Sequence, residues 1–158
     1  MGDINTSYYT GKAATGRLHK LGAFYNTFRQ PWFSFVEDST PLIIGYHIDE
    51  DTLEYHDVVI DFIRTCLKDK WVIAGFDWHE WAENDGAAYF ADMGLMMEAE
   101  ALDLAKVSTV IFGREHANHG YLVEAYANGL LLTVLKRAQG LSAFEPLQEV
   151  AFPINHSI

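Results

Sequence analysis

The chain has 158 residues, 49% of them hydrophobic and 14% aromatic, which is enough for one domain with a buried core. Its 22 acidic and 11 basic residues give a net charge of -11, which repels phosphate backbones and excludes direct nucleic-acid binding as the expected function. The single cysteine, Cys66, excludes an intrachain disulfide, and the longest apolar runs are too short for a membrane span. We therefore expect a cytoplasmic protein that does not associate with membranes.

The first segments are a polar arm and a helix. Residues 1–12 are small and polar apart from two tyrosines, which predicts a flexible N-terminal arm. From Ala13 onward, apolar residues recur at steps of three and four, as on one face of a helix. Pro31 ends this helix, because proline disfavours helical backbone at the residue before it.

Two short apolar segments follow and predict strands. "WFSFV" (Trp32 to Val36) has an alternating pattern, and "LIIGYHI" (Leu42 to Ile48) is rich in β-branched residues. Both are bounded by prolines and acidic residues, so we expect them to pair antiparallel. The predicted fold is therefore α+β: a mostly helical single domain with a small two- or three-stranded antiparallel sheet.

Capping signals place the next helices. Asp51 and Glu54 have the spacing of a capping box before a helix whose apolar stripe includes Cys66. Asp77 is expected to cap a short helix that carries Trp78 and Trp81 on one face. A long helix is expected over residues 95–112, with acidic residues early and a lysine late, as the helix dipole favours.

The stretch "YLVEAYANGLLLTVLKR" (Tyr121 to Arg137) allows two interpretations. Asn128 and Gly129 between apolar runs are typical of a hairpin. The surrounding residues are good helix formers, so a helix ending at Asn128, with Gly129 in the left-handed conformation, is the favoured alternative. The domain is then expected to span residues 13–141, and residues 142–158 to form a C-terminal tail packed on it.

Two polar clusters are candidate sites. His116 and His119 have a spacing that places two metal ligands on one helix face, but a catalytic zinc site needs three protein ligands. The possible third ligands are Glu115, His79 and Asp77. The favoured interpretation is a polar helix–helix turn without a metal, in which Arg114 bonds the last helical carbonyls. In "DWHEW" (Asp77 to Trp81), aromatic rings beside charges suit a ligand surface, although we favour core anchors.

Nucleophilic catalysis and phosphate binding have little support. Cys66 lies on an apolar helix stripe, as a buried hydrophobic residue does. The chain contains no Gly-x-Ser-x-Gly stretch. "TGKAATG" (Thr10 to Gly16) lacks the spacing of a phosphate-binding loop, and no strand precedes it.

Two motifs carry a resemblance to a known family. "FDWHEWAE" (Phe76 to Glu83) and "HGYLVEAYANGLLLTVLKRAQGL" (His119 to Leu141), with a long helix between them, resemble a bacterial family of domains of unknown function. The matching positions are Phe76, Asp77, Trp78, Trp81, Gly120, Leu122, Gly129, Leu131, Leu132, Leu135 and Arg137. The resemblance covers roughly residues 16–141; it implies a fold and no established activity.

The leading functional hypothesis is a non-catalytic binding or interaction domain that recognises a protein partner or self-associates as a homodimer, without a cofactor or metal. The predicted binding residues are Asp77, Trp78, Trp81, Arg114, Glu115, His116 and His119. One alternative is an acidic inhibitor, of phage origin, that occupies a basic nucleic-acid groove on another protein. The other is a metal-dependent hydrolase that uses His116 and His119. The residues establish no enzymatic activity.

Overall fold

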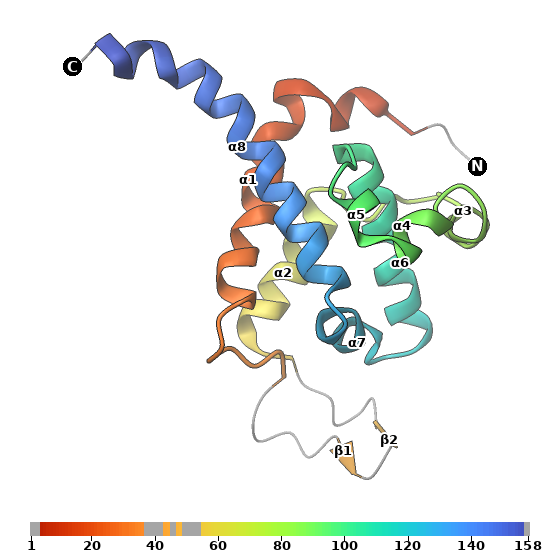
Figure 1. Ribbon diagram of the computed structural model, residues 1–158. Helices are drawn as coiled ribbons and strands as arrows, with labels where there is room; N and C mark the ends of the chain where they lie inside the picture. The colour runs from red at the N-terminus through yellow and green to blue at the C-terminus, as the bar shows by residue number, and fades with distance from the viewer. Residues whose placement is uncertain (1–3, 37–42, 45–46, 49–54, 157–158) are drawn as a thin grey trace.

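The computed structural model describes residues 4–36, 43–44, 47–48 and 55–156, and these residues form a bundle of helices (Figure 1). The helices in chain order are η1 (Thr6–Tyr9), α1 (Gly11–Phe28), α2 (Asp57–Lys68), α3 (Trp78–Glu83), α4 (Ala87–Ala91), α5 (Met93–Met96), α6 (Ala101–Ala117), α7 (Tyr121–Ala127) and α8 (Leu130–His156). None of the helices in the described part of the chain combines the length and apolarity that a membrane span requires.

The predicted α+β fold is wrong, because the part of the chain that the structure describes is mostly helical, with 71% helix and only 2% strand. The strands β1 (Ile43–Ile44) and β2 (His47–Ile48) are two residues each and pair antiparallel, which forms no sheet layer against the described core. The expected strand over residues 32–36 contributes a single isolated bridge, from Val36 to Tyr55.

The alternating pattern of residues 32–36 has another physical cause. Phe33 and Phe35 are buried, while the residues beside them are less so. Their rings lie 5.1 and 5.4 Å from the ring of Phe28 on α1, and Phe35 stacks on Tyr126 of α7 at 4.6 Å. A segment that buries every second side chain in an aromatic cluster has the same sequence period as a half-buried strand.

The longest seam of the bundle lies between α1 and α8, which run antiparallel and side by side (Figure 1). Gly22 permits the close approach, because a Cβ on this residue would lie 2.6 Å from the backbone of Gln139. Gln139 also donates through Nε2 to Asn26 on α1, at 3.1 Å. The seam therefore depends on a residue without a side chain at the point of contact.

Helix α6 is the central element of the bundle. Its buried residues are Ala101, Leu104, Ala105, Val107, Ser108, Thr109, Val110 and Ile111. Since seven of the eight residues from Leu104 to Ile111 are buried, this helix is covered on nearly all sides rather than on one stripe. It begins later than predicted, because Glu100 and Asp103 form a capping box that starts the helix at Ala101.

The structure confirms the predicted helix before Pro31, as α1. It also confirms a helix containing Cys66: α2 begins at Asp57, where Nδ1 of His56 accepts a hydrogen bond from the Val58 amide at 3.1 Å. The predicted capping box of Asp51 and Glu54 lies outside the described residues.

The junction at Gly129 is a helix–Gly–helix turn, so the favoured interpretation is confirmed and the hairpin is excluded. Helix α7 ends at Ala127 and α8 begins at Leu130. Gly129 has a φ of 91°, the left-handed conformation that glycine adopts without strain. The side chain of Asn128 accepts from the Leu130 amide at 2.9 Å and so starts the next helix.

The two ends of the chain contain more helix than the sequence predicts. In the region predicted as an arm, η1 places Tyr9 in the core beside Trp71, and the Tyr9 hydroxyl donates to the Lys70 carbonyl at 2.6 Å. In the region predicted as a tail, α8 continues to His156 and extends past the other helices (Figure 1). The division into arm, domain and tail stays a prediction.

Candidate functional site

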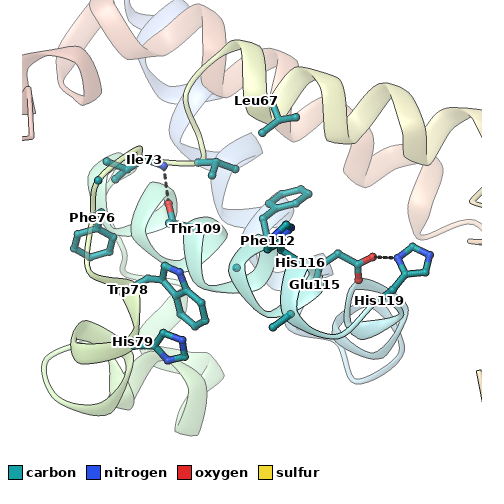
Figure 2. A pocket seen from close by; sticks show the side chains of 14 residues that line it. Leu67, Ile73, Phe76, Trp78, His79, Thr109, Phe112, Glu115, His116 and His119 are labelled. Carbon is teal, nitrogen blue, oxygen red and sulfur yellow. Dashed lines mark hydrogen bonds and ion pairs between the residues drawn. The ribbon is translucent and has the colours of Figure 1, made fainter. Parts of the chain in front are cut away.

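An open groove of about 1060 Å³ lies between the end of α2, the segment that follows it, α3 and α6 (Figure 2). The residues that line it are Leu67, Val72, Ile73, Gly75, Phe76, Trp78, His79, Thr109, Phe112, Gly113, Glu115, His116, Ala117 and His119. Most of the wall is apolar or aromatic; among the polar residues, His79 lies beside Trp78, His116 beside Phe112, and Glu115 and His119 together at the far end (Figure 2). The groove brings together four of the predicted binding residues: Trp78, Glu115, His116 and His119.

Trp78 reaches the groove because α6 has a glycine opposite it. A Cβ on Gly113 would lie 2.3 Å from the Trp78 ring, closer than any real contact, so the ring occupies the place of a side chain. The imidazole of His79 stacks on the indole, with ring centroids 3.7 Å apart. The result is an aromatic wall on one side of the groove, with Trp78 half-buried and His79 exposed, opposite Phe112 and Glu115 in the close view (Figure 2).

Asp77 and Trp81 do not line the groove and instead hold α3 in place. The Asp77 carboxylate accepts from the Glu80 amide at 3.2 Å, which confirms the predicted cap. Trp81 is buried, and a Cβ on Gly86 would lie 2.5 Å from its ring. The predicted role of core anchor therefore fits Trp81. Trp78 both packs against α6 and lines the groove.

Glu115 is the most connected polar side chain at the end of the groove. Its Oε1 accepts from the backbone amides of Gly120 at 3.1 Å and Leu122 at 2.8 Å, and so caps the start of α7 from the preceding helix. Its Oε2 accepts from the Tyr55 hydroxyl at 2.7 Å and lies 2.7 Å from Nδ1 of His119. Both oxygens of this carboxylate are therefore occupied by the protein itself.

Tyr55 is the residue that sequence reasoning missed here, because it is 60 positions away from Glu115. Burial raises the pKa of Tyr55, and the hydrogen bond to Glu115 and the negative charge of that carboxylate raise it further. The hydroxyl is thus held in its protonated, donating form. The cluster of Tyr55, Glu115 and His119 fastens the turn between α6 and α7.

The two histidines of the predicted metal pair have different surroundings. His119 faces Glu115, while His116 lines the groove with an exposed side chain. Within residues 4–36 and 55–143, whose side chains are described, no group of three or more His, Cys, Asp or Glu stands close enough to hold a metal ion. The hydrolase alternative therefore gains no support from the arrangement.

Arg114 lies on the other side of Trp78, in a smaller hollow of about 390 Å³. Its Nη1 donates to the Tyr121 hydroxyl at 3.1 Å, whereas the sequence interpretation assigned it to helical carbonyls. The guanidinium lies 5.2 Å from the ring centre of Phe90 and 5.6 Å from that of Tyr121. Cation–π attraction to these rings restrains the side chain.

Residues 14–143 match a family described as "Family of unknown function (DUF6508)", and the chain belongs to this family. No curated protein and no solved structure matches the chain. The predicted membership in a family of domains of unknown function is therefore confirmed, and the comparisons assign no activity.

The motif residues that carry the resemblance have structural tasks in this fold. Gly120 and Gly129 have positive φ values at the two ends of α7. Arg137 donates through Nε to the carbonyl of Ala99 at 2.8 Å, which fixes the segment between α5 and α6 on α8. The buried members are Trp81, Gly120, Leu122, Leu131 and Leu135. The motif therefore specifies the fold, and most of the groove lining lies outside it.

Proposed function

We propose that this protein is a non-catalytic binding domain whose groove between α2, α3 and α6 takes the apolar body of a small ligand. The observation that carries the proposal is the contrast between the apolar and the polar side chains that line the groove. Its apolar wall is open, and Leu67 is 58% exposed at one edge. Its innermost polar side chains are already paired within the protein.

Thr109 and Glu115 illustrate this pairing. The Thr109 hydroxyl donates to the Ala105 carbonyl at 2.7 Å and accepts from the Ile73 amide at 2.8 Å. Glu115 accepts from the protein through both oxygens. Neither group is placed to act on a substrate as a base or nucleophile, because each has its hydrogen-bonding capacity engaged in holding the fold.

The shape of the groove favours a small molecule over a flat protein partner. Its volume of about 1060 Å³ lies just above the usual range of small-molecule sites, roughly 300–1,000 Å³. Such sites combine a mainly apolar lining with a few polar groups at the edge, which is the arrangement of Phe76, Trp78 and Phe112 with His79 and His116. Exposed apolar side chains in a concave wall gain most when a ligand removes them from water.

The test uses a neutral probe, the methyl ester of 11-(dansylamino)undecanoic acid, whose fluorescence rises in apolar surroundings. We expect saturable binding to the wild-type protein and a loss of about tenfold or more in affinity for Leu67→Asp, because an anion at this edge opposes burial of the alkyl chain. The matched control is Trp32→Asp, at a second exposed apolar residue that does not line the groove. Equal affinities for the two variants, or no saturable binding, would contradict the proposal.

The acidic-inhibitor alternative, the cytoplasmic location and self-association stay predictions. Affinity for a basic partner that falls steeply with salt is the expected property of the inhibitor.

A further inference from the structure

The hollow that contains Arg114 adjoins the groove and shares a wall with it. Trp78, His79 and Ala117 line both spaces. The stacked rings of Trp78 and His79 therefore form a ridge, with the apolar groove on one side and Arg114 with Tyr121 on the other. A ligand of moderate length that lies across this ridge contacts both spaces.

Arg114 has an unusual partner set for a half-buried guanidinium in a chain of net charge -11. Its hydrogen bond goes to the neutral hydroxyl of Tyr121, and its other contacts are ring faces. Among the described residues, no carboxylate lies within ion-pair distance of it. Glu83 lines the same hollow without pairing with Arg114.

The contact with Tyr121 leaves most of the Arg114 donors available to an anion that binds in the hollow. A guanidinium has five N–H groups, of which the contact with Tyr121 uses one. The Tyr121 hydroxyl accepts from Arg114 and keeps its own proton to donate. Because cation–π contacts with Phe90 and Tyr121 and the hydrogen bond to Tyr121 restrain the guanidinium, little side-chain entropy is lost when an anion binds.

We infer that the ligand of the groove is an amphipathic carboxylic acid, whose carboxylate is bound by Arg114 while its apolar body lies across the Trp78–His79 ridge in the groove. The inference rests on the proposed function and adds the chemical class of the ligand. A planar carboxylate matches the fork of a guanidinium and forms two parallel charge-assisted hydrogen bonds with it. The negative charge of the whole chain disfavours non-specific anion binding, so selectivity for an acid has to arise locally.

The experiment compares 11-(dansylamino)undecanoic acid with its methyl ester, two probes that differ only in the charge of one end. Calorimetric or fluorescence titration of the wild-type protein is expected to show that the acid binds about tenfold or more tightly than the ester. The reason is that only the acid forms a charge-assisted pair with Arg114. In Arg114→Gln this ratio is expected to fall to about one, while ester affinity is retained. Arg114→Lys keeps the charge without the fork and is expected to restore part of the preference.

The control variant is Arg64→Gln, which removes an exposed arginine on α2 that lines neither space. It should leave the ratio of acid to ester affinity unchanged. Equal binding of acid and ester by the wild-type protein, with both lost in Leu67→Asp, would overturn the inference and leave the proposed function standing. If neither probe binds, the proposed function fails and the inference fails with it. Ester binding by Arg114→Gln shows that this variant is folded.

Discussion

The two tryptophans of α3 lie three residues apart on one short helix, and their surroundings differ. Trp81 packs over Gly86, is 7% exposed, and closes the core beside α6. Trp78 packs over Gly113 in the same manner, yet stays half-buried because the groove opens beside it. In both cases, an indole ring occupies the space that a side chain would fill if the glycine beneath it had one.

The difference separates packing from binding. The closed side, around Trp81, is complete without a ligand, since the rings of Phe76, Tyr89 and Phe90 pack around the buried indole. The open side, around Trp78, exposes apolar surface next to the guanidinium of Arg114. This guanidinium forms no ion pair with any carboxylate of the described residues. Changes on the closed side should therefore alter stability, and changes on the open side should mainly alter binding.

Truncation of the two rings is the change with the largest expected effect. Trp81→Ala should lower the free energy of unfolding by about 3–5 kcal/mol, because it leaves a cavity in the core. Trp78→Ala should cost clearly less, because part of that ring already faces water. Denaturant unfolding followed by circular dichroism measures both. Equal costs would mean that Trp78 is as much a core residue as Trp81.

The glycines beneath the rings provide a finer comparison. Gly86→Ala should destabilise by about 1–3 kcal/mol, because the buried Trp81 ring has no room to move from the added Cβ. Gly113→Ala should cost less, since the Trp78 ring can swing into the groove and alanine favours a helix by about 1 kcal/mol. The two unfolding midpoints decide this order, and a larger loss at Gly113 would contradict it.

A third glycine isolates backbone conformation from contact. An added Cβ meets nothing within 4 Å at Gly129 or at Gly140, but Gly129 has a positive φ and Gly140 lies within α8. Gly129→Ala should therefore destabilise by about 1–2 kcal/mol, and Gly140→Ala should stabilise slightly. Thermal unfolding of the pair tests this, and a neutral Gly129→Ala would remove the conformational argument for the junction.

The smallest expected effect concerns the polar end of the groove. Tyr55→Phe removes the hydrogen bond to Glu115 and should cost about 1 kcal/mol at neutral pH. The raised pKa of Tyr55 makes this contribution complete below about pH 10. As the pH rises further, the unfolded chain loses the proton that the folded chain keeps, so the wild-type advantage shrinks. Unfolding of both proteins between pH 8 and about pH 11 measures the difference in their free energies of unfolding. A difference that does not change over this range would contradict the raised pKa of Tyr55.

Local signals allowed much of the helical order to be predicted from the sequence. The cap at Asp77, the junction at Gly129 and the apolar position of Cys66 each depend on residues a few places apart. The strand prediction failed at Phe33 and Phe35 because a period of two reports burial and not the partner that provides it.

The candidate site was only partly predictable. The sequence indicated Trp78, Glu115 and Arg114 as polar and aromatic residues of interest, but their roles depend on distant partners. Tyr55 reaches Glu115 across 60 positions, and no periodic pattern connects Gly113 with Trp78. Such pairings follow from the packing of helices, which a single sequence does not specify.

The most direct test of the division between a closed and an open side is a titration of the ¹⁵N-labelled protein with 11-(dansylamino)undecanoic acid, observed at the indole N–H resonances. The chain has four tryptophans, so single Trp→Phe variants assign every signal. The account predicts that the Trp78 indole resonance moves in proportion to occupancy while that of Trp81 stays in place. Movement of Trp81 together with Trp78, or binding that leaves Trp78 unperturbed, would contradict it.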